Sequence, residues 1–423
     1  MTEQAKVERL LPWIMGIAAV IVWVGPMQWI NGAVAQISDI PVYEEAYRQM
    51  AGGAFPYRDF GLEYPPLAAA VFWFAGLLPA SYGTAFSFLM MIAMVLTVVA
   101  VTLTARALGL SLARQVAAGG ITAFLPVLLG GLVGTRFDLV LAALVAWMLW
   151  AVVSDRMTTA WVLLAVAVLV KLVPLAFIPV LLIVHMRRHG GSDALRSALA
   201  GLGVLLVVTL PLALLAPSGL WDSVSYHLDR PLQLESTGAA YLMSMRLLAG
   251  IPLAVDTSFG SQGLAGEAPD LMALISTVLL VVLVLAIALT VLKLVNTQPP
   301  AADSAIFVAG IAATSVALLV AGKVLSPQFL VWIVPAAVLV RGRFGWAAAI
   351  VTAASLLLTQ AYFPRAYWEL VALQDPEMGL LVLRNAVLVV LLALVWPRPG
   401  MGPQAGRESQ PQGDAAPGRT SPG

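Results

Sequence analysis

Residues 157–186 read MTTAWVLLAVAVLVKLVPLAFIPVLLIVHM, an apolar run with Lys171 and Pro174 near its middle. A helix crosses a lipid bilayer with roughly 20 apolar residues. A proline inside a helix removes a backbone hydrogen-bond donor and breaks the ladder. We therefore interpret the run as two half-length helices that meet at Lys171, and we count it as two membrane crossings.

The rest of the chain has the same apolar character. Of its 423 residues, 61% are hydrophobic and only 11% are charged, whereas soluble domains carry roughly 25% charged residues. The first run, 10–30, is longer than the core of a signal peptide, so we expect an uncleaved first span. Further runs cover about 83–105, 116–133, 138–153, 196–217, 271–295, 304–322, 324–340, 344–362 and 379–396.

These runs predict an all-α, polytopic transmembrane protein with about 11–13 spans and both termini on one side. The segment 66–78 is too short to span and is interpreted as re-entrant. In this topology, most of the 23 lysines and arginines lie on the side of the termini. The positive-inside rule then makes the termini cytoplasmic, and the two largest polar loops, 32–65 and 218–270, face outward.

Composition also limits the domains and the chemistry. The chain has no cysteine, three histidines and a net charge of +1, and it contains no Walker loop, HExxH or Asp-x-Asp motif. We therefore expect no metal, no cofactor and no nucleic-acid partner. The transmembrane domain is expected over 1–396, and the Pro- and Gly-rich segment 397–423 is expected to be a disordered cytoplasmic tail.

The first outward loop contains a candidate acid. Asp39 precedes a short helix that is predicted from Pro41 in its first turn and Gly52-Gly53 after its end. A spacing of four places Asp39, Tyr43 and Tyr47 on one side of that helix. Asp39 is either the N-cap of the helix, an active-site acid, or both.

Acids and aromatic residues follow in the same loop. The segment contains Tyr57, Asp59, Glu63 and Tyr64 before a Pro-Pro step. An interfacial aromatic belt is one explanation. Such a belt does not require two carboxylates, so we favour a binding surface.

Other polar residues stand at the predicted outer ends of the spans. Lys171 lies between apolar half-helices, and a lysine in such a place is by default functional. Arg136 and Asp138 join two runs and either pair only with each other or belong to the same site. The stretch 226–236 is either a solvated loop before an interfacial helix near 238–250 or part of the same site, and Lys323 is either a helix anchor or a site residue.

Acids in one place and several separated cations elsewhere suit a particular chemistry. A carboxylate acts as a general base on a hydroxyl, and cations stabilise a departing phosphate. Together these groups describe the transfer of a sugar from a lipid phosphate. Outside the cytoplasm there is no ready supply of nucleotide sugars, which fits the missing Asp-x-Asp motif.

The order of the motifs resembles the GT-C superfamily of integral-membrane glycosyltransferases. Within that superfamily, the chain is most similar to the bacterial family 87 type, the polyprenyl-phosphate-mannose-dependent mannosyltransferases. The resemblance extends over about 11–396. It rests on Asp39-x3-Tyr43, Gly53-x3-Tyr57-x-Asp59, Glu63-Tyr64-Pro65-Pro66-Leu67, Lys171-x2-Pro174, Gln233-x-Glu235-Ser236 and Ser326-Pro327-Gln328-Phe329.

The resemblance implies an inverting hexosyltransferase with a polyprenyl-phosphate sugar as donor, an envelope glycolipid or polysaccharide as acceptor, and membrane lipids around it. It implies Asp39 as catalytic base, and donor-phosphate contacts from Lys171, Arg230, Lys323 and Gln328. Substrate contacts are expected from Tyr43, Tyr57, Asp59, Glu63, Tyr64, His227, Gln233, Glu235 and Ser236. The stretch 134–138 departs from the amide-bearing pattern of the family, which leaves mannose and other hexoses open.

Other classes of protein remain. A transporter or flippase of lipid-linked sugars would also have broken helices and an intramembrane lysine, but its polar residues should lie near the midplane. A non-catalytic membrane scaffold would not need carboxylates and cations on one face. Within the superfamily, transfer to a protein serine or threonine is a further possibility.

Overall fold

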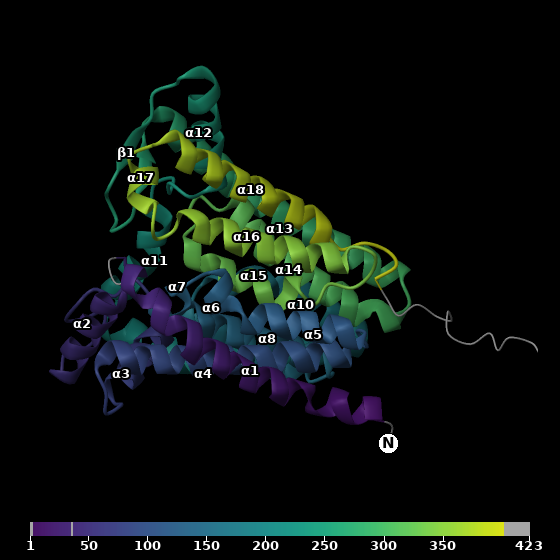
Figure 1. Ribbon diagram of the computed structural model, residues 1–423. Coiled ribbons are helices and arrows are strands. Elements are labelled where there is room, and N and C mark those ends of the chain that lie inside the picture. Colours follow the sequence, from purple (N-terminus) through teal and green to yellow (C-terminus); the bar gives the residue numbers. More distant parts are fainter. Residues whose placement is uncertain (1–2, 35–36, 402–423) are drawn as a thin grey trace, which may run out of the picture.

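The computed structural model describes residues 3–34 and 37–401, and in these residues the protein is built from α-helices with a small two-stranded sheet (Figure 1). The first half contains α1 (Glu3–Val34), α2 (Ile40–Ala51), α3 (Pro66–Gly76), α4 (Tyr82–Ala107), α5 (Leu112–Ala123), α6 (Leu125–Leu128), α7 (Leu132–Thr135), α8 (Asp138–Val153), α9 (Met157–Val170), the 3-10 helix η1 (Val173–Phe177) and α10 (Ile178–Leu215).

The second half continues with short elements and long helices. These are α11 (Pro217–Asp229), α12 (Thr237–Ala249), β1 (Ala254–Asp256), β2 (Gly263–Ala265), α13 (Glu267–Thr297), η2 (Pro300–Ala302), α14 (Asp303–Ala321), η3 (Pro327–Phe329), α15 (Leu330–Ala337), α16 (Gly345–Tyr362), α17 (Tyr367–Val371) and α18 (Asp375–Val395). β1 and β2 pair antiparallel. Most of the predicted tail 397–423 lies outside the described residues.

The long helices run between two ends of the molecule. The N-terminal end of α1 and the C-terminal end of α18 lie at the same end, whereas α2, α11, α12, α17 and the sheet gather at the other (Figure 1). Apart from α17, which lies between α16 and α18, the elements of this second end come from the two loops that the sequence predicts to face outward. The two predicted loops therefore meet in space.

The all-α polytopic membrane fold is confirmed. In the described part of the chain, seven segments are long and apolar enough to cross a membrane: Lys6–Gly25, Tyr82–Ala107, Val173–Leu215, Glu267–Thr297, Pro300–Ala321, Gly345–Tyr362 and Asp375–Val395. The other predicted runs form shorter helices, among them α8, α9 and α15. The interfacial helix predicted near 238–250 is present as α12.

The prediction of one continuous run over 116–133 is wrong. The chain is broken there into α5, α6 and α7. Pro126 lies in the first turn of α6, and Gly130 has φ +74°, a left-handed conformation that glycine adopts without steric cost. Hydropathy alone does not reveal such breaks, because leucines and valines fill the segment on both sides of them.

The run 157–186 is interrupted at Lys171, as predicted. α9 ends at Val170, and η1 begins at Val173. A second bend lies inside α10, where Gly190 has φ +80° and separates two helical parts. The bend brings Asp193 back to His185, with 2.9 Å between Oδ2 and Nε2. Lys171 therefore lies in the turn between α9 and η1.

The interior of the bundle is formed around α14. Nearly all of its side chains are buried, and its Thr314 and Ser315 hydroxyls donate to carbonyls one turn earlier, as polar residues do inside membranes. Gly310 allows close packing, since an added Cβ would lie 2.8 Å from Val180 and 3.0 Å from Val291. α14 packs against α13, α15 and α18, and so fixes the helices that carry the last site segments.

The two outward segments touch at a glycine. A Cβ on Gly219, at the beginning of α11, would lie 1.8 Å from the carbonyl oxygen of Tyr57. Tyr57 itself has φ +69°, and its hydroxyl donates to the carbonyl of Tyr64 at 2.6 Å. This close approach requires glycine at position 219.

We expect Gly219→Ala to lower the stability of the protein by about 1–3 kcal/mol, because the new methyl group forces the two segments apart. Thermal unfolding of the purified protein in detergent measures the effect. Gly203→Ala is the matched control, since a Cβ at that helical position meets nothing within 4 Å. The control should unfold at the same temperature or slightly above it, and an equal loss in both variants would contradict the contact.

Candidate active site

A cavity of about 1710 Å³ lies at the end of the molecule where the two outward segments meet. Its walls come from the segments 37–64, 136–138, 171–176, 218–235, 259–262, 322–332 and 363–368, together with Leu280 and Leu318. All but one of the site residues predicted from the sequence line it. They are Asp39, Tyr43, Tyr57, Asp59, Glu63, Tyr64, Lys171, His227, Arg230, Gln233, Glu235, Lys323 and Gln328.

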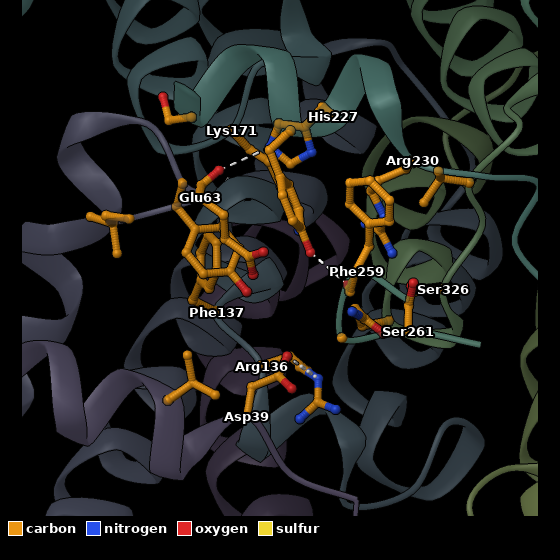
Figure 2. A pocket seen from close by; sticks show the side chains of 18 of the residues that line it. Asp39, Glu63, Arg136, Phe137, Lys171, His227, Arg230, Phe259, Ser261 and Ser326 are labelled. Atoms are coloured by element: carbon orange, nitrogen blue, oxygen red, sulfur yellow. Dashed lines mark hydrogen bonds and ion pairs between the residues drawn. The ribbon is translucent and has the colours of Figure 1, made fainter. Parts of the chain in front are cut away.

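Asp39 forms an ion pair at the cavity wall. Its Oδ2 lies 2.8 Å from Nε of Arg136 and accepts a hydrogen bond from the Tyr43 hydroxyl at 3.3 Å. Figure 2 shows the two charged side chains facing each other. Asp39 precedes α2 but makes no side-chain capping hydrogen bond, so its carboxylate serves the cavity and not the helix end.

The environment of Asp39 sets its acidity. Burial raises the pKa of its carboxyl above the ordinary value, while the charge of Arg136 acts in the opposite direction. The side chain keeps 32% of its exposure, so a substrate can reach it, whereas Arg136 keeps only 7%. Asp39 is therefore an accessible carboxylate with a raised pKa, which is the property required of a base.

Aromatic rings support this carboxylate from behind. The Tyr43 ring is buried and stacks on Phe72, with 4.4 Å between the ring centroids. Phe137 meets Tyr64 edge to face at 5.0 Å. Tyr43 and Tyr64 were predicted to contact substrate, and both line the cavity as parts of this cluster.

Arg136 and Asp138 do not pair with each other, so the structure contradicts the alternative of a local pair. They lie on either side of Phe137 and take different partners. The Asp138 carboxylate lies 2.7 Å from the ammonium of Lys171 and accepts a 2.6 Å hydrogen bond from the indole of Trp332. Arg136 follows α7 with an extended backbone, whereas Asp138 is the first residue of α8, and each charge has its own partner.

Lys171 is enclosed as well as paired. Its ammonium lies 4.8 to 4.9 Å from the ring centroids of Phe137, Phe329 and Trp332. Cations are attracted to the faces of aromatic rings. The side chain keeps 14% of its exposure, and so Lys171 presents a partly neutralised positive charge at the cavity wall.

One hydrogen bond joins the first outward segment to the second, and another closes the second segment on itself. The ring Nε2 of His227, on α11, is 3.0 Å from the carbonyl oxygen of Glu63, as Figure 2 shows. Burial lowers the pKa of His227, so a neutral ring donates to that carbonyl. The Tyr226 hydroxyl donates to the carbonyl of Phe259 at 2.6 Å.

Two further cations stand on the opposite wall. Arg230 follows α11, its guanidinium lies 5.8 Å from the ring centroid of Tyr226, and its Nε has no hydrogen-bond partner in the described part of the chain. Lys323 donates to the carbonyl of Leu228 at 2.5 Å. Burial lowers the pKa of Lys323. Arg230 is thus a cation with spare donors at the cavity.

A buried acid forms the floor near η3. Glu235 accepts a hydrogen bond from Gln233 at 3.2 Å, and Gln233 also donates to Ser326 at 2.9 Å. Burial raises the pKa of Glu235 to about 7. The Glu235 backbone carbonyl accepts from Arg384, a fully buried residue of α18, at 2.9 Å.

Sequence reasoning placed some residues well and missed others. Ser236 does not line the cavity, since its hydroxyl accepts from Ala239 N and caps α12. Asp59 lies at the rim, paired with Arg58 at 2.7 Å. Sequence reasoning did not predict that Arg136 pairs with Asp39. It also did not predict the roles of Trp332, Tyr226 and Arg384. A charge inside the apolar run 379–396 was the available signal for Arg384.

The arrangement suits acid–base chemistry on a hydroxyl next to an anion. Asp39 is an accessible acceptor for a proton, and Arg230, Lys323 and Lys171 border the same cavity. The described residues contain no group of three His, Cys, Asp or Glu side chains that could hold a metal ion. The wall also contains apolar residues such as Leu172, Val173 and Leu280, so the cavity offers both polar and apolar surface.

Comparisons with known proteins were made against families and curated proteins. The family model described as glycosyltransferase family 87 matches residues 62–322, which is more than half of the chain. The matched part includes Arg136, Lys171 and Arg230, while Asp39 precedes it and Lys323 directly follows it. No curated protein matches the chain.

We expect Lys171→Met to lower the free energy of unfolding by about 3–5 kcal/mol, because it leaves the buried Asp138 carboxylate without its counter-ion. In an Asp138→Asn background the same substitution should cost far less. Thermal unfolding of the four proteins in the cycle measures the coupling. Lys293→Met on α13, where the lysine is exposed, should change little. Additive losses in the cycle would contradict the pair.

Proposed function

The chain belongs to glycosyltransferase family 87 and is a membrane glycosyltransferase, and we propose that it uses a polyprenyl-phosphate hexose as donor. Mannose is the first candidate for the hexose, and an envelope glycolipid or polysaccharide is the acceptor. The observation that carries the proposal is the accessible Asp39 carboxylate in a cavity bordered by three cations.

In the proposed reaction Asp39 is the general base. It accepts the proton of the acceptor hydroxyl as that oxygen attacks the anomeric carbon of the donor. The bond between the anomeric carbon and the phosphate oxygen breaks, and the polyprenyl phosphate leaves with the bonding electrons. Attack from the face opposite the phosphate inverts the configuration at the anomeric carbon. The ion pair with Arg136 keeps the carboxylate oriented toward the cavity.

The departing phosphate requires positive charge. We assign this role first to Arg230, whose Nε has no hydrogen-bond partner in the described residues, because guanidinium groups bind phosphate oxygens in pairs. Lys323 and Lys171 add charge from neighbouring walls, and Gln328 adds an amide. Lys171 contributes less than a free ammonium would, because Asp138 lies 2.7 Å away.

The remaining wall residues are proposed to hold the sugar and the acceptor. Glu63, Asp59 and Glu235 accept hydrogen bonds from hydroxyl groups of the sugar or the acceptor. Gln233 and His227 supply further polar contacts. Tyr64, which is half-buried, provides aromatic surface on which a sugar ring packs. Tyr43 and Tyr57 are almost fully buried and support the cavity wall behind it. Ser236 does not contact substrate directly. Its hydroxyl accepts a hydrogen bond from Ala239 N and so fixes the beginning of α12.

We further propose that the cavity opens on the extracytoplasmic side and that both termini are cytoplasmic. The charge distribution in the sequence supports this orientation. The position of the α1 and α18 ends opposite the cavity is consistent with it (Figure 1). A lipid-linked donor suits this side, since it needs no soluble nucleotide sugar.

Asp39→Asn should abolish sugar transfer while leaving donor binding intact, because the amide cannot accept the proton. The assay uses the protein in lipid nanodiscs with radiolabelled polyprenyl-phosphate-mannose and a total envelope-lipid extract, and counts label in new lipids. Glu44→Gln is the matched control. Glu44 lies on α2, the helix that Asp39 precedes, pairs with Arg48 at 3.0 Å and does not line the cavity. Full activity in Asp39→Asn would refute the assignment. If no label is transferred, and the protein reconstituted into vesicles carries the labelled lipid across their membrane, a transporter is favoured instead.

The pH dependence of transfer should report on Asp39. The rate requires the ionised carboxylate, so it falls as the pH drops through the raised pKa of Asp39. Arg136→Gln removes the charge that lowers this pKa, and we expect the acid limb to move up by about 1–2 pH units. Arg136→Lys keeps the positive charge, so its acid limb should stay close to the wild-type position. If the acid limb of the pH profile does not move in Arg136→Gln, a group other than Asp39 is responsible for it.

A further inference from the structure

A second, smaller cavity of about 440 Å³ lies at the opposite end of the molecule. It is formed by the loop between α15 and α16 and by the chain after α18, and its walls are Arg341, Gly342, Arg343, Phe344, Arg398, Pro399, Gly400 and Met401. Gly342 and Gly400 have φ +86° and +79°. These left-handed conformations favour glycine. The loops lie side by side, since a Cβ on Gly342 would be in ordinary contact with the carbonyl oxygen of Gly400 at 3.7 Å.

Three of the eight wall residues are arginines, and none is an acid. The guanidinium groups of Arg343 and Arg398 lie 4.5 and 4.4 Å from the ring centroid of the same residue, Phe344. Within residues 3–34 and 37–401, no ion pair joins Arg341, Arg343 or Arg398 to a carboxylate. Like charges gathered without a counter-ion repel each other, and a bound anion would relieve that repulsion.

The protein itself provides hydrogen-bond acceptors for only some of the donors of these three arginines. Arg341 donates to the carbonyl of Leu108 at 2.6 Å, and Arg398 donates to the carbonyls of Ala393, Leu394 and Trp396. These contacts orient the guanidinium groups but bring no negative charge. Arg343 is exposed, and no hydrogen bond of its side chain is found in the described part of the chain. Its donors are therefore open to a ligand.

Two neighbouring features add to the positive character. α16, an 18-residue helix, begins directly after Phe344, and the N-terminus of a helix attracts anions. Arg114 lies beside its first residue: its Nη1 is buried without a hydrogen-bond partner among the described residues and lies 3.0 Å from the position of a Cβ on Gly345. The wall thus concentrates positive charge in a space of defined volume.

The surroundings favour a lipid over a soluble anion. The cavity lies where α15, α16 and α18 end or begin, and the ring of Trp346 beside it is 49% exposed. Tryptophans are enriched at the level of lipid headgroups. Phe344 and Met401 give the cavity apolar wall beside the arginines. Charge for phosphate together with apolar and interfacial surface matches a phospholipid.

We propose that this second cavity binds the phosphate of an anionic phospholipid headgroup. Arg343 and Arg398 contact the phosphate from the two sides of the Phe344 ring, and Arg341 supplies a third charge. The site is separate from the large cavity and from the sugar transfer proposed there. It anchors the loop before α16 and the end of α18 to the lipid surface.

The test is native mass spectrometry of the full-length protein in detergent, titrated with phosphatidylglycerol or with phosphatidylcholine. We expect wild type to retain phosphatidylglycerol preferentially, and Arg343→Gln/Arg398→Gln to bind it about tenfold more weakly. The matched control is Arg187→Gln/Arg196→Gln, which removes the same charge from two exposed arginines on α10 outside the cavity wall. The control should bind like wild type.

Several results would overturn the proposal. They are equal phosphatidylglycerol binding by the Arg343/Arg398 variant and wild type, an equal loss in the Arg187/Arg196 control, or displacement of the lipid by millimolar inorganic phosphate. The last result would assign the cavity to a soluble anion. If the double variant does not fold, Arg343→Gln alone decides the question, because that exposed side chain contributes little to folding. Retention of the lipid by that single variant at wild-type strength would refute the proposal.

Discussion

The buried ion pair between Asp138 and Lys171 is the constraint on which the large cavity depends. It joins the beginning of α8 to the break after α9, and the indole of Trp332 ties α15 to the same carboxylate. Removing one partner of such a pair typically costs about 3–5 kcal/mol. Because Asp138 faces Lys171, its neighbour Arg136 is left to face Asp39 across Phe137. The pair fixes the beginning of α8, two residues after the arginine that pairs with the candidate base.

Contacts between the outward segments complete the cavity. His227 is hydrogen-bonded to the carbonyl of Glu63, and Gly219 lies against the backbone of Tyr57. These contacts hold Arg230, the cation that we propose to bind the donor phosphate, in the wall of the same cavity as Asp39. A base, separated cations and an apolar wall at one end of a helical bundle agree with membership of glycosyltransferase family 87. Chemistry on a lipid-borne substrate needs this combination of surfaces.

Much of this could be predicted from the sequence, because hydropathy and helix signals are local. The apolar runs, the break at Lys171 and the helix between Asp39 and Gly52 were predicted and are present. The partners of the charges could not be predicted. Arg136 and Asp138 are two residues apart, and only the folded chain shows that each pairs with a distant residue. The breaks in α5–α7 and the hydroxyl of Ser236 at a helix cap depend on backbone geometry that hydropathy does not encode.

The central claim is that sugar is transferred from a lipid phosphate at the cavity of Asp39. The most direct measurement gives the purified protein in nanodiscs equal amounts of labelled mannose, either on polyprenyl phosphate or on a nucleotide, with envelope lipids as acceptor. We predict a labelled product from the polyprenyl donor alone, with the anomeric configuration inverted. Transfer from the nucleotide sugar, or a product of retained configuration, would contradict it.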